Sequence, residues 1–228
     1  MIAHSTASLT SPPATRRRFL LGLAGLVAAL PLVGELPHPA EAQAAQSAVA
    51  QKIADHFSSI RTMTGDFVQF GPRGEQTGGK FYIARPGRLR FNYEAPSGYR
   101  VISDGQSVVI DNRKLNTMDL YPLSKTPLKL LLDDRIDLTG RRVTGIKEEP
   151  DVITIQMADR SVFGNSRISL MFDAKTYDLK QWTITDAQGK NTTVLIDNVQ
   201  QGVPLDAGLF KIDYKRNREV NQKMQNKR

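Results

Sequence analysis

The chain has 228 residues, and 31 Lys and Arg against 23 Asp and Glu give it a formal net charge of +8. It contains no cysteine, which excludes disulfides, thiolate nucleophiles and cysteine-ligated metal sites. The positive charge allows attraction to anionic lipid or to nucleic acid but does not select between them.

The N-terminal segment has the pattern of an export signal. Arg16-Arg17-Arg18 precede an apolar run from Phe19 to about Val33, and an Ala-x-Ala site follows at Ala40-Glu41-Ala42. This order is typical of a cleaved twin-arginine signal. An uncleaved anchor is the alternative, although the run is short for a membrane span of roughly 20 residues. We expect residues 1–42 to be removed and residues 43–228 to form a single domain with a basic C-terminal tail.

The first expected element of the mature chain is a helix from Ala48 to Arg61. Val49, Ile53, Phe57 and Ile60 recur at helical spacing and would line one face. His56 lies in the same stretch, and a Ser-His-Asp triad would have to use it. We expect His56 to be structural or solvated instead.

After Met63 the apolar residues alternate with a period of two, which predicts strands. Asp104-Gly105 lies between two such runs and is typical of a tight hairpin turn. The expected strands are Asp66–Phe70, Gly79–Ile83, Arg88–Tyr93, Tyr99–Ser103, Ser107–Asp111 and Leu115–Leu120.

A short helix is expected midway, because Thr126 can cap it, Pro127 suits its first position and leucines follow. Strands then return at Val152–Met157, Arg167–Phe172, Leu179–Thr185 and Thr192–Val199. Phe210–Ile212 should end the ordered part, with a loose, polar and basic tail from Lys215 to Arg228.

This pattern amounts to about nine to eleven short strands and two helices, with turn signals between them. It predicts a mainly β fold with an α lid. The sheet would be an open, incomplete antiparallel β-barrel, a half-barrel covered by short helices. The apolar faces of the two helices would rest on its concave side.

Four segments, in order, carry a likeness to a known family. They are Phe67-x-Gln69, the run from Gly79 to Pro96, Ser103-Asp104-Gly105, and the run from Thr126 to Leu132. Together they resemble the periplasmic outer-membrane lipoprotein carriers, the LolA-like family. The likeness extends from about Val49 to Ile212. The twin-arginine signal, Phe91 where many members have tryptophan, and the stretch after Ile212 depart from the family pattern.

The resemblance implies a half-barrel whose hydrophobic cavity holds the acyl chains of lipoproteins beneath a helical lid. Such carriers receive lipoproteins from an inner-membrane ABC lipoprotein exporter, LolCDE-like, and cross the periplasm. They deliver to an outer-membrane receptor or to the outer membrane itself. The resemblance further implies a monomer that is not an enzyme and has no cofactor. We expect no nucleic-acid binding, because the chain has an export signal and no aromatic residues are interleaved with the basic ones of its tail. The physical need is independent of the family, because acyl chains cannot cross water unaided.

The resemblance also implies roles for individual residues. Arg85 matches an arginine that latches the lid by hydrogen bonds to helix carbonyls; an ordinary solvated arginine is the alternative. Candidates for the acyl-chain cavity are Phe67, Phe81, Leu89, Phe91, Met118 and Trp182, for which plain core is the alternative. Candidates for the inner face of the lid are Ile53, Phe57, Leu128, Leu131 and Leu132.

Three other functions remain open at this point. The same fold could carry another lipid or glycolipid, since an apolar cavity does not identify its ligand. A sensor of mislocalised lipoproteins would need a second domain. An enzyme is the third, yet we expect no catalytic residue and no metal site. The acidic residues Asp104, Asp133 and Asp134 lie at turns or helix ends, where carboxylates are usually solvated.

Overall fold

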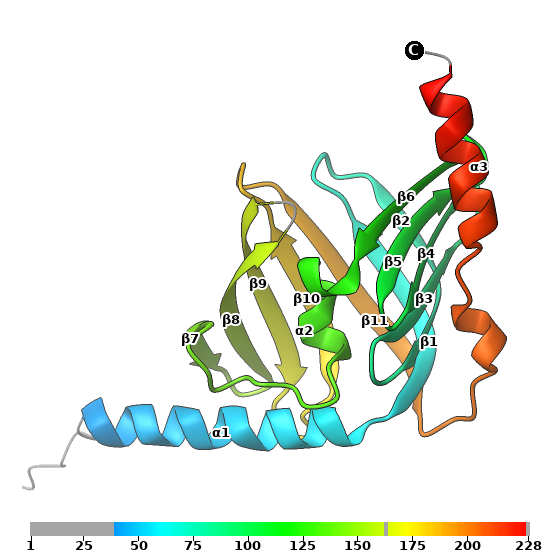
Figure 1. Cartoon of the computed structure of the whole chain (residues 1–228). Coiled ribbons are helices and arrows are strands. Elements are labelled where there is room, and N and C mark those ends of the chain that lie inside the picture. Colours follow the sequence, from blue (N-terminus) through cyan, green and yellow to red (C-terminus); the bar gives the residue numbers. More distant parts are fainter. Residues whose placement is uncertain (1–38, 162–163, 227–228) are drawn as a thin grey trace, which may run out of the picture. The chain divides into compact units, whose positions relative to one another are not determined.

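Eleven antiparallel strands form one sheet in the computed structural model, which describes residues 39–161 and 164–226 (Figure 1). The described residues all belong to one unit, Pro37–Arg228. Along the sheet the order is β6-β5-β4-β3-β2-β1-β11-β10-β9-β8-β7. The first half of the strands is β1 (Thr62–Phe70), β2 (Gln76–Ala84), β3 (Arg88–Tyr93), β4 (Tyr99–Asp104), β5 (Ser107–Asn112) and β6 (Thr117–Pro122). The second half is β7 (Val143–Glu148), β8 (Val152–Ser161), β9 (Gly164–Asp173), β10 (Leu179–Thr185) and β11 (Asn191–Gln201).

The helices are few and mostly short. They are α1 (Pro39–Ser59), α2 (Leu128–Leu132) and α3 (Tyr214–Gln225), with 3₁₀ turns η1 (Leu123–Lys125) and η2 (Ala207–Phe210). None of the helices in the described part of the chain is long and apolar enough to span a membrane.

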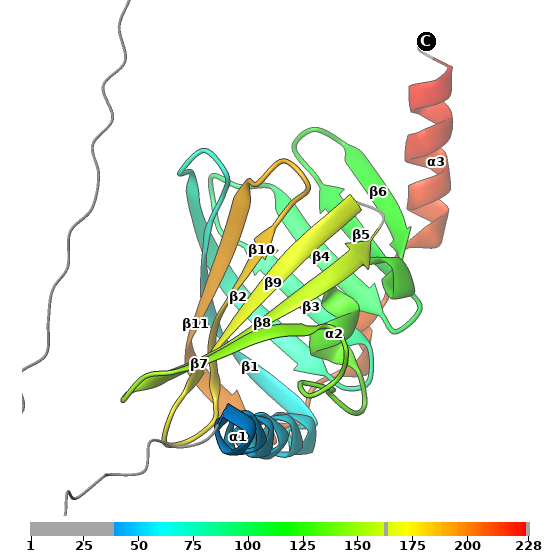
Figure 2. The same cartoon turned by 90° about the vertical axis from the view of Figure 1, so that its left-hand side faces the viewer.

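The sheet is curved but not closed, because its edge strands β6 and β7 do not pair with each other. The strands bend around α2 (Figure 2), and α1 lies across one end of the sheet (Figure 1). The predicted fold class, a mainly β half-barrel with short helices, is therefore confirmed. Its central pair is β1 with β11, joined by a register that includes Phe67 opposite Ile196.

Alternation along the strands divides the buried side chains between two faces. The larger cluster fills the concave side and includes residues of both α1 and α2. On α1, Ile53 and Phe57 are buried, and the Phe57 ring meets the Phe172 ring at 5.7 Å between centroids. A separate cluster lies on the outer face: Ile102, Val109, Met118, Ile212 and Val220.

The outer cluster corrects one prediction. Met118 is buried on the outer face, packed with Val220 of α3, and so does not line the concave side. On a strand, successive side chains point to opposite faces. Tyr121, an odd number of residues away, faces the concave side instead.

The C-terminal segment was also predicted wrongly. It is not loose, because α3 is a twelve-residue helix. The side chain of Asp213 caps it by accepting a hydrogen bond from the backbone N–H of Arg216 at 2.9 Å. On its buried side, Asn217 Nδ2 donates to the Met118 carbonyl at 2.8 Å.

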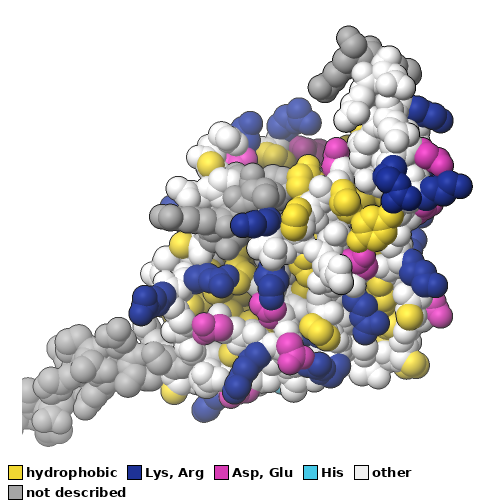
Figure 3. Space-filling model, in the orientation of Figure 1, with side chains coloured by type: hydrophobic (Ala, Val, Ile, Leu, Met, Phe, Trp, Pro, Cys, Tyr) yellow, Lys and Arg dark blue, Asp and Glu magenta, His cyan; other side chains and the backbone are white. Residues whose placement is uncertain are grey.

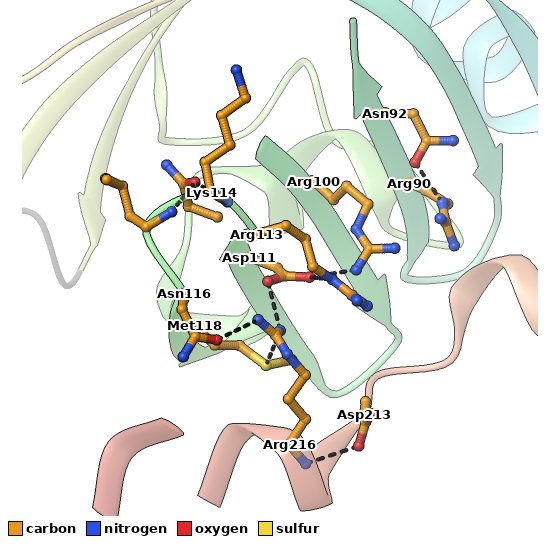
Figure 4. Close-up of polar contacts among 12 residues, drawn as sticks. Arg90, Asn92, Arg100, Asp111, Arg113, Lys114, Asn116, Met118, Asp213 and Arg216 are labelled. Carbon is orange, nitrogen blue, oxygen red and sulfur yellow. Dashed lines mark hydrogen bonds and ion pairs between the residues drawn. The ribbon is translucent and has the colours of Figure 1, made fainter. Parts of the chain in front are cut away.

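A buried carboxylate holds α3 to the sheet (Figure 4). Asp111 Oδ1 accepts from Arg216 Nη1 at 2.7 Å, and Oδ2 accepts from Arg100 Nη2 at 2.5 Å and from Arg113 Nε at 3.2 Å. Burial alone would raise the pKa of Asp111, but the hydrogen bonds from these arginines outweigh burial and hold it below its usual value.

Other differences from the predictions concern element bounds. The first helix begins at Pro39 rather than near Ala48, so it includes the proposed cleavage site. The first strand begins at Thr62, and β7 was not predicted at all. The arginine run and the apolar run of the predicted signal lie outside the described residues.

Candidate functional site

A cavity of about 510 Å³ lies between the concave face of the sheet and α2. Strands β3 to β6 supply one wall, β9 to β11 supply the other, and α2 with the residues before it lies across them. Its apolar lining is Phe91, Tyr93, Val101, Val108, Ile110, Tyr121, Pro127, Leu128, Trp182, Ile184 and Val194. In the space-filling view, hydrophobic side chains reach the surface above α2 (Figure 3).

Five of the six polar lining residues lie toward one end of the cavity; the sixth, Thr126, lies just before α2. Gln69 is near the end of β1, Ser166 is near the start of β9, and Thr192 is near the start of β11. Asp186 and Gln188 belong to the turn between β10 and β11. The registers of β9, β10 and β11 bring these strand ends to the same end of the sheet. Apart from Thr126, the cavity is thus apolar inside and polar at this end.

The predicted cavity residues are only partly brought together. Phe91 and Trp182 line the cavity, and their rings are 6.1 Å apart. Phe67, Phe81 and Leu89 are buried on the same concave side, behind the lining. Met118 belongs to the outer face, as described above.

Packing behind the lining fixes its aromatic side chains. The Phe67 ring contacts Phe91 edge-on at 4.6 Å between centroids. Tyr93 donates its hydroxyl hydrogen bond to Gln69 Oε1 at 2.7 Å, and burial raises the pKa of Tyr93 to about 12. These contacts hold the wall of the cavity in place.

Sequence reasoning missed several lining residues that a simple signal contained. Val101, Val108 and Ile110 occupy alternate positions on the hairpin of β4 and β5. This strict alternation predicts that they share a face. It does not tell which face of the sheet has a helix over it.

Arg85 connects the ends of α1 and α2. Its side chain is only 4% exposed, and Nε and Nη2 donate to the Leu131 carbonyl at 3.2 and 3.0 Å. Nη1 donates to the carbonyl of Ile60, which follows α1, at 2.5 Å. The guanidinium also lies 4.2 Å from the centre of the Phe57 ring. The contacts expected of a lid latch are therefore present; the role itself stays a prediction.

The charge of Arg85 is balanced by dipoles rather than by an acid. Burial, with a smaller effect of nearby Arg61, lowers the pKa of Arg85 to about 10, so the side chain is protonated at neutral pH. No salt bridge to Arg85 is found among the described residues. Helix carbonyls are suitable partners, because the last turn of a helix leaves them unpaired.

Backbone contacts hold α2 at the same place. The N–H of Gly87 donates to the Leu132 carbonyl at 2.7 Å. Gly87 has a φ of +76°, and a Cβ there would lie 2.7 Å from the Cα of Gly105. Only glycine fits this close approach. After α2, Asp134 forms an ion pair with Arg61 at 2.6 Å.

The predicted inner face of the lid also packs against the concave side. Ile53, Phe57, Leu131 and Leu132 are buried in the large cluster. Leu128 lies partly buried and forms part of the cavity lining. Both helices thus present apolar side chains to the sheet.

His56 has a structural contact. Its Nε2 lies 2.9 Å from Asp178 Oδ1, and the same oxygen accepts from Gln201 Nε2 at 2.7 Å. This contact ties α1 to the turn before β10. In the described part of the chain, no three His, Asp or Glu side chains are grouped to hold a metal.

Comparison with known proteins gives a consistent family. The family model described as outer membrane lipoprotein carrier protein LolA matches residues 58–213. An outer-membrane lipoprotein carrier protein of Pseudomonas aeruginosa is 27% identical over 199 residues, covering 82% of this chain and 91% of that protein. The carrier protein of Chromohalobacter salexigens is 26% identical over 191 residues, covering 80% and 90%.

Solved structures show a weaker likeness. The crystal structure of a LolA superfamily protein from Nitrosomonas europaea has 12% identity and a TM-score of 0.40, covering 72% of this chain and 98% of that one. The family model, in contrast, spans both walls of the cavity, α2 and Arg85. Because it matches more than half of the residues, the chain belongs to the LolA family of outer membrane lipoprotein carrier proteins.

Proposed function

We propose that this protein carries lipoproteins through the periplasm with their acyl chains in the cavity beneath α2. The observation that carries the proposal is the cavity itself, apolar along its walls and polar at one end. Its volume lies within the range of roughly 300–1,000 Å³ typical of ligand sites. Proteins of this family are carriers, and the chain is accordingly not an enzyme.

The energetics favour an acyl chain as the occupant. Each methylene removed from water contributes roughly 0.8 kcal/mol. Side chains such as Leu128, Val101 and Ile184 offer no hydrogen bond that a polar ligand would need. An alkyl chain is bound through the area it buries, without a need for a chemically specific partner.

Release requires that binding be reversible, and Arg85 supplies a physical means. In the closed state its guanidinium has lost its water and is held by the carbonyls of Leu131 and Ile60. When α2 moves away, the guanidinium regains water, which offsets part of the lost hydrogen bonding. The lid can therefore open at a modest cost, and its closure over an empty cavity favours discharge of the cargo.

The route of the cargo is inferred from membership of the LolA family. We infer that the carrier, as a monomer, accepts lipoproteins from a LolCDE-like ABC exporter in the inner membrane. It delivers them to an outer-membrane receptor or directly to the outer membrane. The predicted signal in residues 1–42 supports export to the periplasm.

The test is to recover the protein from the periplasm of its native cells and identify what co-purifies by mass spectrometry. A triacylated protein supports the lipoprotein carrier. Free phospholipid or glycolipid as the occupant would contradict it and favour a carrier of another lipid. Depletion of the protein should also leave lipoproteins in the inner membrane, and normal sorting after depletion would count against the proposal.

A further inference from the structure

The hydroxyl of Ser166 is a polar group among the apolar side chains that face the concave side of β9. Ser166 lies on β9, where the inward-facing residues that follow are Ile168, Leu170 and Phe172. Its neighbours Asn165 and Arg167 are exposed, whereas Ser166 is 6% exposed. It therefore points to the concave side, where it lines the polar end of the cavity.

The Ser166 hydroxyl is buried without a partner. Its Oγ has no hydrogen bond among the described residues. Other buried hydroxyls are paired: Ser103 Oγ donates to the Gly87 carbonyl at 2.7 Å, and Thr126 Oγ1 donates to the Leu123 carbonyl at 2.9 Å. Burying an unpaired hydroxyl is unfavourable, so such a group calls for an explanation.

The position of Ser166 indicates what kind of partner would satisfy it. An alkyl chain lying along Trp182 and Val194 has no polar atom. Its first acceptor is the carbonyl oxygen where the chain joins a head group by an ester or amide bond. A chain that fills the apolar part of the cavity would place this junction at the polar end, beside Ser166.

Charge favours a neutral carbonyl over a free carboxylate. Asp186 is the charged residue in the cavity lining, and it is acidic. Thr185 of β10 pairs with Arg167 of β9, and Asp186 is the next residue along the chain. Because the two strands are antiparallel, Asp186 lies opposite Ser166. A fatty-acid carboxylate there would be repelled by Asp186, whereas an ester would not.

We propose that Ser166 donates a hydrogen bond to the carbonyl oxygen of a bound acyl chain, which makes the cavity selective for acyl over alkyl ligands. This inference rests on the proposed function, since it requires that the cavity hold lipid chains. It goes further by assigning the polar end a chemical preference.

The test compares two synthetic lipopeptides with the same peptide and chain lengths, one with two ester-linked acyl chains and one with ether-linked alkyl chains. Wild-type protein should bind the ester compound about fivefold more tightly, as expected for one hydrogen bond. Ser166→Ala should remove this preference by weakening ester binding alone. Ser166→Thr, which keeps a hydroxyl, should retain it.

Val194→Ala is the matched control, because it changes an apolar wall residue of the same cavity. It should weaken binding of both compounds equally and leave their ratio unchanged. A second readout is the infrared band of a ¹³C-labelled ester carbonyl. This band should lie at lower frequency when bound to wild type than when bound to Ser166→Ala.

The outcomes separate the two proposals. If wild type binds both compounds equally, or Ser166→Ala weakens both alike with no shift of the carbonyl band, the role of Ser166 is wrong and the carrier function stands. If wild type binds neither compound, the carrier function fails, and the role of Ser166 fails with it.

Discussion

Among single residues, Arg85 is the one on which closure of the lid depends most. Its position was predictable, because an arginine before the strand-ending Pro86 matched a family pattern. Its contacts were not, since Ile60 and Leu131 are 25 and 46 residues away along the chain. A buried cation held by carbonyls and by the Phe57 ring is a tertiary feature that local patterns do not contain.

Replacing Arg85 tests the latch directly. Arg85→Leu keeps an apolar stem against Phe57, so we expect the variant to fold. It should bind acylated cargo but release it slowly, because the closed, empty lid loses the hydrogen bonds that favour discharge. Transfer of a labelled lipoprotein to outer-membrane vesicles measures this.

Arg73→Leu serves as the control, since Arg73 lies in an exposed turn with 91% of its side chain exposed. It should transfer cargo like the wild type. Normal transfer by Arg85→Leu would remove Arg85 from the mechanism.

The cavity residues show where residue-level reasoning succeeds and where it fails. Phe91 and Trp182 lie in the cavity wall, and their contact with acyl chains stays a prediction. Met118 was wrongly expected there, because alternation identifies two faces of a strand without showing which one a helix covers. The chain covers both, with α2 inside and α3 outside. Ser166 was overlooked because serine near a turn usually faces water.

At the scale of elements, α3 is the largest departure from the sequence prediction. Its residues are mostly polar, and only Asn217 and Val220 are buried. The helix is held instead by Asp111, which is 105 residues away from Arg216. Such a contact carries no local signal, so the basic polar sequence by itself predicts a loose segment.

Removing the carboxylate should release α3. Asp111→Asn leaves three arginines around a neutral side chain, and we expect a loss of roughly 3 kcal/mol in unfolding free energy. Hydrogen exchange should rise across residues 214–225 while the residues of α2 stay protected. Glu219→Gln, on the same helix but exposed, should change neither. Unchanged protection of α3 in Asp111→Asn would refute the anchor.

Acid should have the same effect as the substitution. The pKa of Asp111 is lower in the folded state than in the unfolded state. Its stabilising contribution is therefore complete above the ordinary aspartate pKa of about 3.9 and is lost as pH falls through the lower folded-state pKa. The protection of the α3 amides against hydrogen exchange should accordingly fall only below about pH 4. Loss of protection near pH 6 would point to a different group.

At the scale of the whole molecule, the sheet makes the cavity. Pairing β1 with β11 joins the two halves of the chain at the centre, and the unpaired edges β6 and β7 leave the sheet open. Short alternating segments and a family likeness were enough to predict this class of fold. They did not give β7, the pairing of distant strands, or the empty volume, which depends on how all the side chains pack together.

Acyl chains that occupy this volume would lie beside Trp182, which can therefore report on them. It is the only tryptophan in the chain and lines the cavity. A triacylated lipopeptide brominated midway along its chains should quench Trp182 fluorescence, saturating at one lipopeptide per protein. The unbrominated compound should bind equally without quenching. If the brominated compound binds and Trp182 fluorescence is unaffected, the chains lie elsewhere and the account is contradicted.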